Sequence, residues 1–354
     1  MLARLGGDEF ALLVESIAET EEPARIARRL LALFEQPFAV ADVQVSLGAS
    51  IGIAIAPQDG SDPEDLTRRA DIALYRAKGG RGSFRFFEAE MDAQVKRRAT
   101  IERDLRRAIE DGTVCPHYQA IVDLKSERIT GFEALARWHH PEFGELEPEH
   151  FIAIAEDAGL IIPLSSALLR MAARDAMDWP TDVKLSFNIS RAQLADPLMV
   201  LRVLQILGET GLSPTRLEVE ISEQALVADI LAAQQALEAF HQAGVRIALD
   251  DFGTGNSSLQ HLRACHFDRL KIDRSFVMAM ASSQEEASLV NAMLGLSKAL
   301  GLAVTAEGIE DAGLIAGLRE GGRSEGQGFT FSKALPRLEA LELLAAGTRL
   351  RATA

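Results

Sequence analysis

The pattern of apolar and polar positions divides the chain into three parts. In the first part, residues 1–87, it predicts a buried strand over 46–56, a helix over 63–78 and a closing strand over 83–87. Residues 88–112 are charged and repeat apolar side chains at helical spacing, which predicts one connecting helix, or two helices with a break. From Val114 onward, short apolar runs alternate with amphipathic segments, as in strands interleaved with helices.

The third part contains eight predicted strands with helices between most of them, for example over 193–207 and 230–243. This alternation favours an α/β fold with a (β/α)8-type barrel. A short Lys-Ser-Glu-Arg turn separates the first two strands, which predicts a hairpin and therefore one antiparallel strand. The predicted strands are 116–123, 129–138, 184–190, 217–222, 246–252, 269–273, 303–309 and 325–329.

Polar side chains recur near the same end of these strands. Both faces of a barrel strand are covered, so exposure to solvent does not explain them, and chemistry in such barrels collects at the C-terminal strand ends. An oxygen-only donor set without Cys or His suits Mg²⁺ or Mn²⁺. Five such donors exceed what one Mg²⁺ usually takes from protein, which favours a pair of ions. The candidate ligands are Glu133, Asn188, Glu220, Asp250 and Asp251.

Asp250 and Asp251 are adjacent at the end of one predicted strand. Neighbouring side chains of a strand point to opposite faces, so both can reach one site only if the strand twists or ends at Asp251. Gly253 and Gly255 permit such a turn. We therefore predict that Asp250 bridges both ions and that Asp251 turns toward the second.

Composition and charge narrow the functional classes. The chain has 354 residues, enough for two domains, and its net charge of −15 argues against binding to nucleic-acid polymers. No apolar run approaches the roughly 20 residues that cross a bilayer, and no signal peptide follows Met1. Cys115 and Cys265 are not spaced as metal ligands, so a cytoplasmic protein is expected.

Eight ordered stretches of the third part form a specific set of motifs. They are YQAIVD (118–123), FEALARW (132–138), FNIS (187–190), LEVEISE (217–223), DDFGTGNSSL (250–259), LKIDRSFV (270–277), AEGIE (306–310) and QGF (327–329). Together they resemble the EAL domain, the family of cyclic di-GMP phosphodiesterases, over about residues 97–345. The resemblance implies hydrolysis of cyclic di-GMP to linear pGpG.

The resemblance also assigns roles to single residues. It implies that the five oxygen donors hold two Mg²⁺ or Mn²⁺ ions, that Lys271 and Glu307 lie around the attacking water, and that Glu223 braces the loop after the aspartate pair. A homodimer through the EAL domain is also implied, although Asn256 stands where Tyr is usual in the loop that couples the metal site to the dimer interface. The residues implied to contact cyclic di-GMP are Gln119, Arg137, Asp273, Glu310 and Gln327.

Two stretches near the start, LARLGGDEFALL (2–13) and ADIALYRAKGGRGSFRFF (70–87), are similar to the C-terminal half of a GGDEF domain, the diguanylate cyclase family. The strand with the other metal-binding acid and the guanine-reading helix have no counterpart. We expect Met1 to be an internal or truncated start, and the half-domain to be a remnant with uncovered apolar surface. The expected division is a partial GGDEF domain over 1–87, a helical linker over 88–100 and an EAL domain over 101–350.

Other functions fit less well. The Asp-Phe-Gly of 251–253 also occurs in kinases, but the other kinase motifs are missing. A noncatalytic cyclic di-GMP receptor or signalling scaffold would typically have lost metal ligands, and all are present here. A working cyclase is disfavoured by the missing half-domain. His139 and His140 are expected in a surface loop after their strand rather than at a metal.

Overall fold

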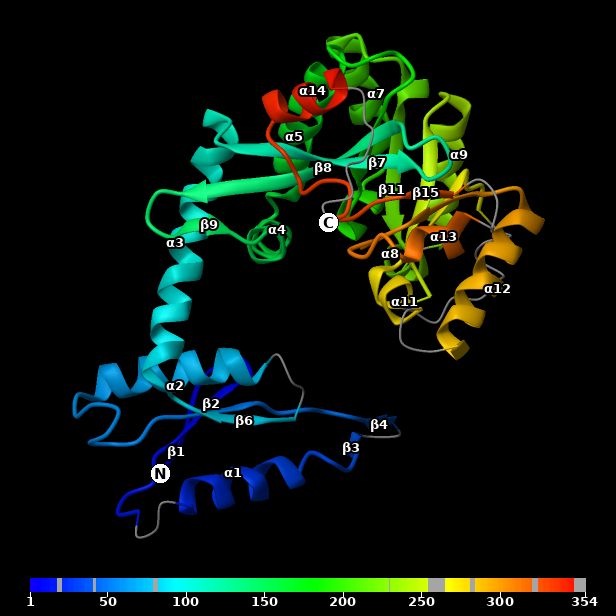
Figure 1. Ribbon diagram of the computed structural model, residues 1–354. Helices are drawn as coiled ribbons and strands as arrows, with labels where there is room; N and C mark the ends of the chain where they lie inside the picture. Colours follow the sequence, from blue (N-terminus) through cyan, green and yellow to red (C-terminus); the bar gives the residue numbers. More distant parts are fainter. Residues whose placement is uncertain are drawn as a thin grey trace. The chain divides into compact units, whose positions relative to one another are not determined.

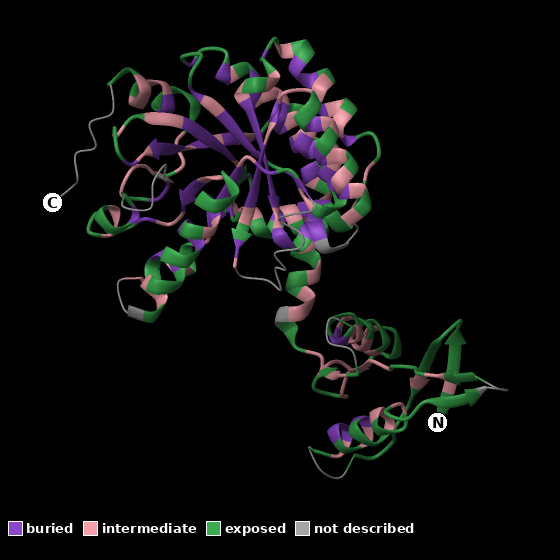
Figure 2. Cartoon of the chain, turned by 90° about the vertical axis from the view of Figure 1, so that its right-hand side faces the viewer, coloured by how far each residue is buried: buried purple, intermediate pink, exposed green. Residues whose placement is uncertain are grey.

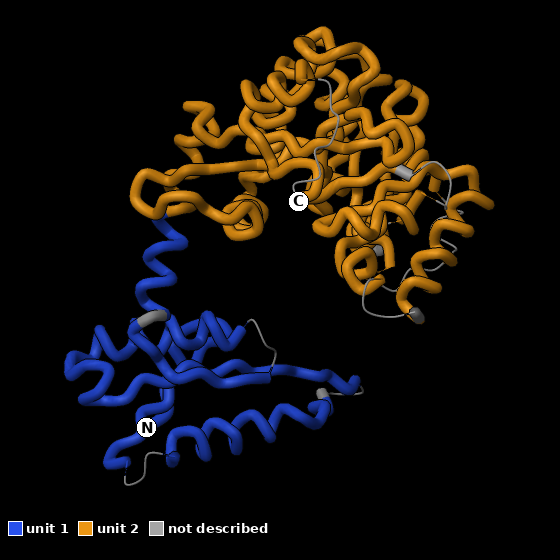
Figure 3. Tube along the Cα trace, in the orientation of Figure 1, with its two compact units in different colours: residues 1–100 blue, residues 101–354 orange. Residues whose placement is uncertain are grey.

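The computed structural model describes residues 1–17, 21–40, 43–78, 82–228, 230–253, 265–280, 284–319 and 324–346. The chain forms two compact units, residues 1–100 (unit 1) and 101–354 (unit 2) (Figure 3). Gly255 and Asn256 lie outside the described residues. Within the described ranges, no helix is both long and apolar enough to cross a membrane.

Unit 1 consists of strand pairs and helices. The helix predicted over 63–78 is confirmed as α2, and it begins where it does because the Asp62 side chain accepts the amides of Glu64 and Asp65. The strand predicted over 46–56 is much shorter, because its partner β6 offers only three residues to pair with. The elements are β1 (Leu2–Gly6) antiparallel to β2 (Glu9–Leu12), α1 (Glu22–Ala32), β3 (Phe38–Val40) antiparallel to β4 (Val43–Val45), β5 (Ile51–Ile53) parallel to β6 (Phe84–Phe86), and α2 (Pro63–Ala77).

The hairpin β1–β2 leaves apolar side chains in solvent, as Figure 2 shows by its exposed colour. Leu2 is 70% exposed and Phe10 is 60% exposed. A sheet face of this kind normally packs against further elements, and in this chain β1 and β2 leave it exposed.

Unit 2 contains a closed barrel of eight strands (Figure 1). All neighbouring barrel strands are parallel except β7, which is antiparallel to both β8 and β15, and pairing of β8 with β10 closes the barrel. The barrel and its one antiparallel strand are therefore confirmed. The strands are β7 (Val114–Asp123), β8 (Ile129–His140), β10 (Lys184–Asn188), β11 (Leu217–Ser222), β12 (Arg246–Phe252), β13 (Arg269–Ile272), β14 (Ala303–Ala306) and β15 (Ser324–Gly326), with β9 (Gly144–Leu146) added beside β8.

Helices surround the barrel, whose strands are buried (Figure 2). In β11, for example, Leu217 and Val219 are fully buried on the outer face, while the alternate glutamates point to the barrel interior. The helices are α3 (Ala89–Asp111), α4 (Pro148–Asp157), α5 (Ile161–Ala176), α6 (Arg191–Leu194), α7 (Met199–Thr210), the short 3-10 helix η1 (Pro214–Arg216), α8 (Glu223–Ala228), α9 (Ile230–Gln242), α11 (Arg274–Ala279), α12 (Gln284–Leu300), α13 (Leu314–Arg319) and α14 (Arg337–Ala345).

The structure decides whether two predicted helices are continuous. The segment 88–112 forms the single helix α3, without a break. The helix predicted over 193–207 is present but divided, because α6 ends at Leu194 and α7 begins at Met199. Pro197 explains the division, since proline disfavours helical backbone at the preceding residue and has no N–H to donate. Asp196 instead accepts the amide of Leu198.

The placement of His139 and His140 in a surface loop is also wrong. β8 continues through His140 because β9 provides a pairing partner. The His140 ring is 1% exposed, and its Nδ1 accepts the amides of Glu142 and Phe143. Its Nε2 lies 3.4 Å from an oxygen of Asp104 in α3. His140 is therefore a buried structural residue, whereas His139 is exposed.

Candidate active site

Each of the eight barrel strands brings one polar side chain to a common site inside the barrel. Six of them lie within the strands, and the other two directly follow β14 and β15. This arrangement follows from the parallel pairing, which collects the C-terminal ends of seven strands at one end of the barrel. In chain order from β7 to β15 the residues are Gln119, Glu133, Asn188, Glu220, Asp250, Lys271, Glu307 and Gln327.

Lys271 lies at the centre of the carboxylates. Its Nζ is 2.6 Å from an oxygen of Glu220 and 2.6 Å from an oxygen of Glu307. It is also 3.5 Å from oxygens of both Glu133 and Asp250. The lysine is 1% exposed. The nearby carboxylates outweigh the effect of burial and hold the pKa of Lys271 well above its usual range, so the ammonium is charged at neutral pH.

Amide side chains orient Glu133. Asn188 Nδ2 donates to one of its oxygens at 2.7 Å, and Gln327 Nε2 donates to the other at 2.6 Å. Gln327 also donates to Gln119, whose own amide donates to the carbonyl of Ser332. Ser332 was not predicted from the sequence. Because Asn188 donates through its nitrogen, its carbonyl oxygen remains as the ligand atom.

The aspartate pair reaches the site through a β-bulge. Of the two predicted alternatives, a twist of the strand or its end at Asp251, the end is not found, because β12 continues to Phe252. Its register against β13 instead shifts between Leu249 and Phe252, and Asp251 has a left-handed backbone with φ of 54°. Oxygens of Asp250, Asp251 and Glu307 thereby lie within 4.8 Å of one another.

Glu223 lies behind this bulge, where one of its oxygens accepts the amide of Gly253 at 3.5 Å. Glu223 is 2% exposed. Gly253 has φ of +101°, and a Cβ there would lie 2.8 Å from side-chain atoms of Phe276 and Met293. A larger residue would therefore be strained in both backbone and packing. This contact is the one expected of a residue that braces the turn after the aspartates.

The charges of the site are unbalanced. Five carboxylates and one ammonium sum to a formal charge of −4, which two divalent cations would cancel. Burial, reinforced by Asp250 and Glu133 and opposed by Lys271, raises the pKa of Glu307 to about 8. Burial and the same two carboxylates raise the pKa of Glu220 well above its usual range. In Glu133 the ammonium and the two amide donors outweigh burial, and its pKa is lowered.

Oxygen donors of this kind fit hard divalent cations. One oxygen of Glu220 is buried and has no hydrogen-bond partner within the described residues. A buried carboxylate oxygen without a partner is costly, and a cation would satisfy it. The residues present therefore fit a metal centre.

Three residues predicted to contact the ligand have other partners. Arg137 donates to the carbonyl of Ala136. Asp273 caps α11 by accepting the amide of Ser275 at 2.9 Å. Glu310 lies 2.9 Å from a guanidinium nitrogen of Arg274. Asp273 still approaches the cluster, since its charge contributes to the raised pKa of Asp251, which is mainly caused by burial and by Asp250.

Sequence comparison places these residues in a known family. Residues 102–334 match the EAL domain, and residues 1–83 match the diguanylate cyclase GGDEF domain. The chain belongs to the EAL domain family. All of the polar residues of the barrel site lie within the matched EAL region.

Two relatives are similar to this chain over nearly its whole length. The chain is 37% identical over 340 residues to the cyclic di-GMP phosphodiesterase PdeR of Escherichia coli, covering 95% of this chain and 51% of PdeR. It is 36% identical over 349 residues to the bifunctional diguanylate cyclase/cyclic di-GMP phosphodiesterase MucR of Pseudomonas aeruginosa, covering 97% and 51%. The chain thus spans about half the length of these curated relatives.

Solved structures agree with the fold. The structure described as PaMucR phosphodiesterase in complex with c-di-GMP superposes with a TM-score of 0.65 at 33% identity, covering 68% of this chain and 99% of that one. The match covers nearly all of the solved domain and therefore supports the barrel topology as well as the family.

A second polar layer lies deeper in the EAL barrel and was not recognised from the sequence. Arg269, 4% exposed, has guanidinium nitrogens 2.8 Å from Glu218 and 2.6 Å from Glu325, and it donates to Thr305 at 2.9 Å. These residues lie two positions before Lys271, Glu220, Gln327 and Glu307, so strand alternation places both sets in the barrel interior. The deeper layer is an ion-pair network centred on Arg269, in which Glu218 Oε2 is buried without a hydrogen-bond partner among the described residues.

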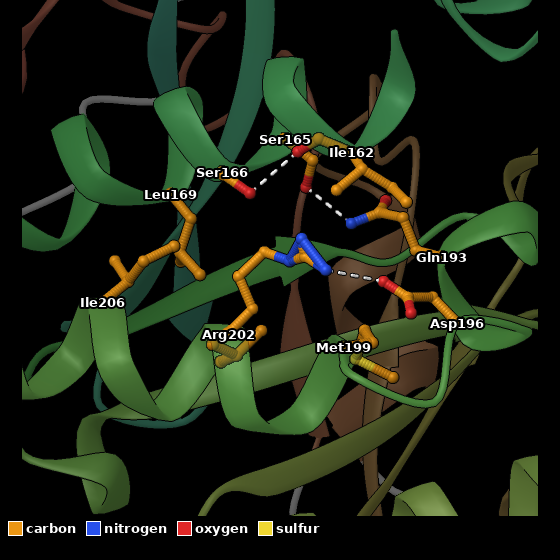
Figure 4. Close-up of a pocket in the computed structure, with 10 residues that line it drawn as sticks. Ile162, Ser165, Ser166, Leu169, Gln193, Asp196, Met199, Arg202 and Ile206 are labelled. Carbon is orange, nitrogen blue, oxygen red and sulfur yellow. Dashed lines mark hydrogen bonds and ion pairs between the residues drawn. The ribbon is translucent and has the colours of Figure 1, made fainter. Parts of the chain in front are cut away.

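A small cavity between α5 and α7 is separate from this site (Figure 4). Its volume is about 20 Å³, enough for one water. Gln193 donates to Ser165 at 2.8 Å and Arg202 pairs with Asp196 at 2.8 Å along its wall. These contacts hold α6 and α7 against α5, and the cavity is a packing feature.

Proposed function

We propose that this EAL domain hydrolyses cyclic di-GMP to linear pGpG with two Mg²⁺ or Mn²⁺ ions. The observation that carries the proposal is the unbalanced oxygen-donor cluster around Lys271. A chain that only bound the dinucleotide would not need buried carboxylates with an excess formal charge of −4. The names of PdeR and MucR support the same substrate.

In this proposal, Glu133, Asn188, Glu220, Asp250 and Asp251 hold the two ions. The ions would supply an activated water and would offset the charge of the phosphodiester. The bulge at Asp251 lets two neighbouring aspartates act at one site, and Glu223 keeps that bulge in place through Gly253.

Lys271 and Glu307 form the pair beside the scissile bond. The ammonium of Lys271 can orient the attacking water and stabilise negative charge that develops on the phosphate. With the ions bound, Glu307 would be ionised and could accept the proton that the water loses. Lys271 Nζ lies 2.6 Å from Glu307 Oε1. A proton taken from the water can therefore reside on Glu307 while Lys271 stays charged.

The remaining assignments stay predictions. Gln119 and Gln327 lie at the site and can position the dinucleotide, and a guanidinium such as that of Arg137 suits a phosphate. Asp273, Glu310, a homodimer through the EAL domain, and the partial GGDEF domain over 1–87 with its linker over 88–100 likewise stay predictions. Asp8 in the exposed turn and Glu9 at the start of β2 resemble only the C-terminal half of a cyclase domain, so we expect no synthesis from GTP by this chain.

Nucleotide chromatography tests the proposal. Purified chain with cyclic di-GMP and Mg²⁺ or Mn²⁺ is expected to yield pGpG, while Asp250→Asn should yield little. Tight binding of cyclic di-GMP without cleavage would favour the noncatalytic receptor. Any cyclic dinucleotide formed from GTP alone would contradict the expectation that this chain makes none.

A further inference from the structure

Two histidines and an aspartate meet at the opposite end of the barrel from the active site. His241 lies in the last turn of α9, just before β12 begins. His266 and Asp268 lie in the segment that leads into β13. Both imidazoles are exposed to solvent, and their ring centroids are 4.0 Å apart with an angle of 43° between the planes.

The three side chains are arranged around a common point. One nitrogen from each ring and one oxygen of Asp268 lie within 4.8 Å of one another. A point no more than about 2.8 Å from all three atoms therefore exists, compared with bonds of about 2.0–2.2 Å from Zn²⁺ to His and Asp. Side-chain movements of about 0.6–0.8 Å would close this gap, and both rings are exposed to solvent.

The carboxylate of Asp268 is already oriented. Its Oδ2 accepts the amide of Ile247 in β12 at 2.9 Å. A hydrogen bond from the backbone to the second oxygen of a carboxylate ligand orients that ligand and strengthens metal binding. Among the described residues, no hydrogen bond or ion pair joins either ring to Asp268, so the three groups do not already satisfy one another.

The donor types differ from those of the active site. Two imidazoles and one carboxylate suit Zn²⁺ and its first-row neighbours, whereas an oxygen-only cluster suits Mg²⁺. Three protein ligands leave a fourth position for water. We propose that His241, His266 and Asp268 form a second, independent metal site that binds one divalent transition-metal ion of the Zn²⁺ type.

Such an ion would join the end of α9 to the segment entering β13. Lys271 lies three residues beyond Asp268 on that strand, so the site would restrain the base of a strand that enters the active site. Its ligands are not part of the proposed catalytic machinery, and the inference does not depend on the proposed hydrolysis.

Calorimetric titration of the full chain with Zn²⁺, in excess Mg²⁺ to occupy the oxygen cluster, tests the site. We expect one Zn²⁺ per chain, and an affinity at least about tenfold weaker in each of His241→Ala, His266→Ala and Asp268→Asn. Titration with Co²⁺ should produce the visible absorption of a four-coordinate ion in wild type and not in the variants.

Matched controls separate this site from other donors. His139→Ala removes an exposed histidine that pairs with Glu145 at 3.0 Å and belongs to no three-ligand cluster among the described residues, and the variant should bind Zn²⁺ as wild type does. Cys265→Ser should also leave binding unchanged, because the proposed ligands do not include the thiol. Phosphodiester cleavage in Mg²⁺ should be the same in His266→Ala and wild type.

The proposal would be overturned if wild type bound Zn²⁺ no more tightly than the three ligand variants. Since both rings are exposed, the two histidine substitutions should leave the melting temperature of the metal-free chain unchanged. If Asp268→Asn loosens the fold, the two histidine variants alone still decide the question.

Discussion

Replacing Lys271 by methionine removes the one cation that the described residues place among the five carboxylates of the site. The side chain keeps a similar length and its apolar stem, so packing changes little. The charge of the site does change, because the formal charge of the cluster falls from −4 to −5. Glu220 and Glu307 each lose an ion-pair partner at 2.6 Å in a buried environment.

Removing one partner of a buried ion pair costs about 3–5 kcal/mol of folding stability. For a domain of this size, about 2–4 °C of melting temperature correspond to each kcal/mol. Metal-free Lys271→Met should therefore melt about 6–20 °C below wild type. Mg²⁺ should recover part of this loss, because the cations would replace the missing positive charge, and its stabilising effect should be larger in the variant than in wild type.

Calorimetric melts with EDTA and with Mg²⁺ measure these differences, and Lys298→Met on the exposed face of α12 is the matched control. Turnover should fall about 10²–10³-fold in Lys271→Met while affinity for cyclic di-GMP changes much less, since the lysine acts on developing charge. Equal melting of Lys271→Met and Lys298→Met, or equal losses in kcat and in binding, would refute the reasoning.

Three further predictions follow from the same contacts. Asp250→Asn should lower kcat at least about a hundredfold with a nearly unchanged melting temperature, and wild-type turnover in the folded variant would contradict the two-ion proposal. Because the pKa of Glu307 is raised to about 8 without metal, Mg²⁺ must displace its proton below that pH. Glu220, whose pKa is also raised, must lose its proton as well. Affinity for Mg²⁺ should thus rise with pH through neutrality, and calorimetry at pH 7 in buffers of different ionisation enthalpy should show proton release. Arg269→Met should destabilise the chain by about 3–5 kcal/mol in denaturant unfolding, because Glu218 stays buried without its cation, and a loss below about 1 kcal/mol would contradict this.

Much of the barrel could be predicted from the chain because its signals are local. Strands such as β11 and β12 were predicted with their observed limits, since apolar alternation and flanking helices leave little choice. Local signals also explain the failures. Pro197 should have divided the predicted helix, whereas β9, which extends β8 to His140, is a three-residue strand formed only through tertiary pairing.

The geometry of the aspartate pair could be predicted only in part. Alternation showed that a regular strand cannot direct both Asp250 and Asp251 to one site. It did not show that a register shift, rather than the end of the strand, solves the problem. A bulge depends on the neighbouring strand β13, and the left-handed backbone falls on Asp251 itself rather than only on a glycine.

The two polar layers of the barrel show why alternation alone could not separate structure from chemistry. Glu218 and Glu220 lie two residues apart on one strand, as do Arg269 and Lys271 on another, so the sequence pattern treats the pairs alike. Their charge balance differs. In the deeper layer, two glutamates face Arg269 and Arg246, whose Nε lies 3.8 Å from Glu218, and the formal charge is zero. In the upper layer it is −4. The deeper layer has no formal charge left to balance, whereas the upper layer does and is proposed to bind divalent cations. EDTA should therefore destabilise the upper layer and leave the contribution of the deeper layer unchanged.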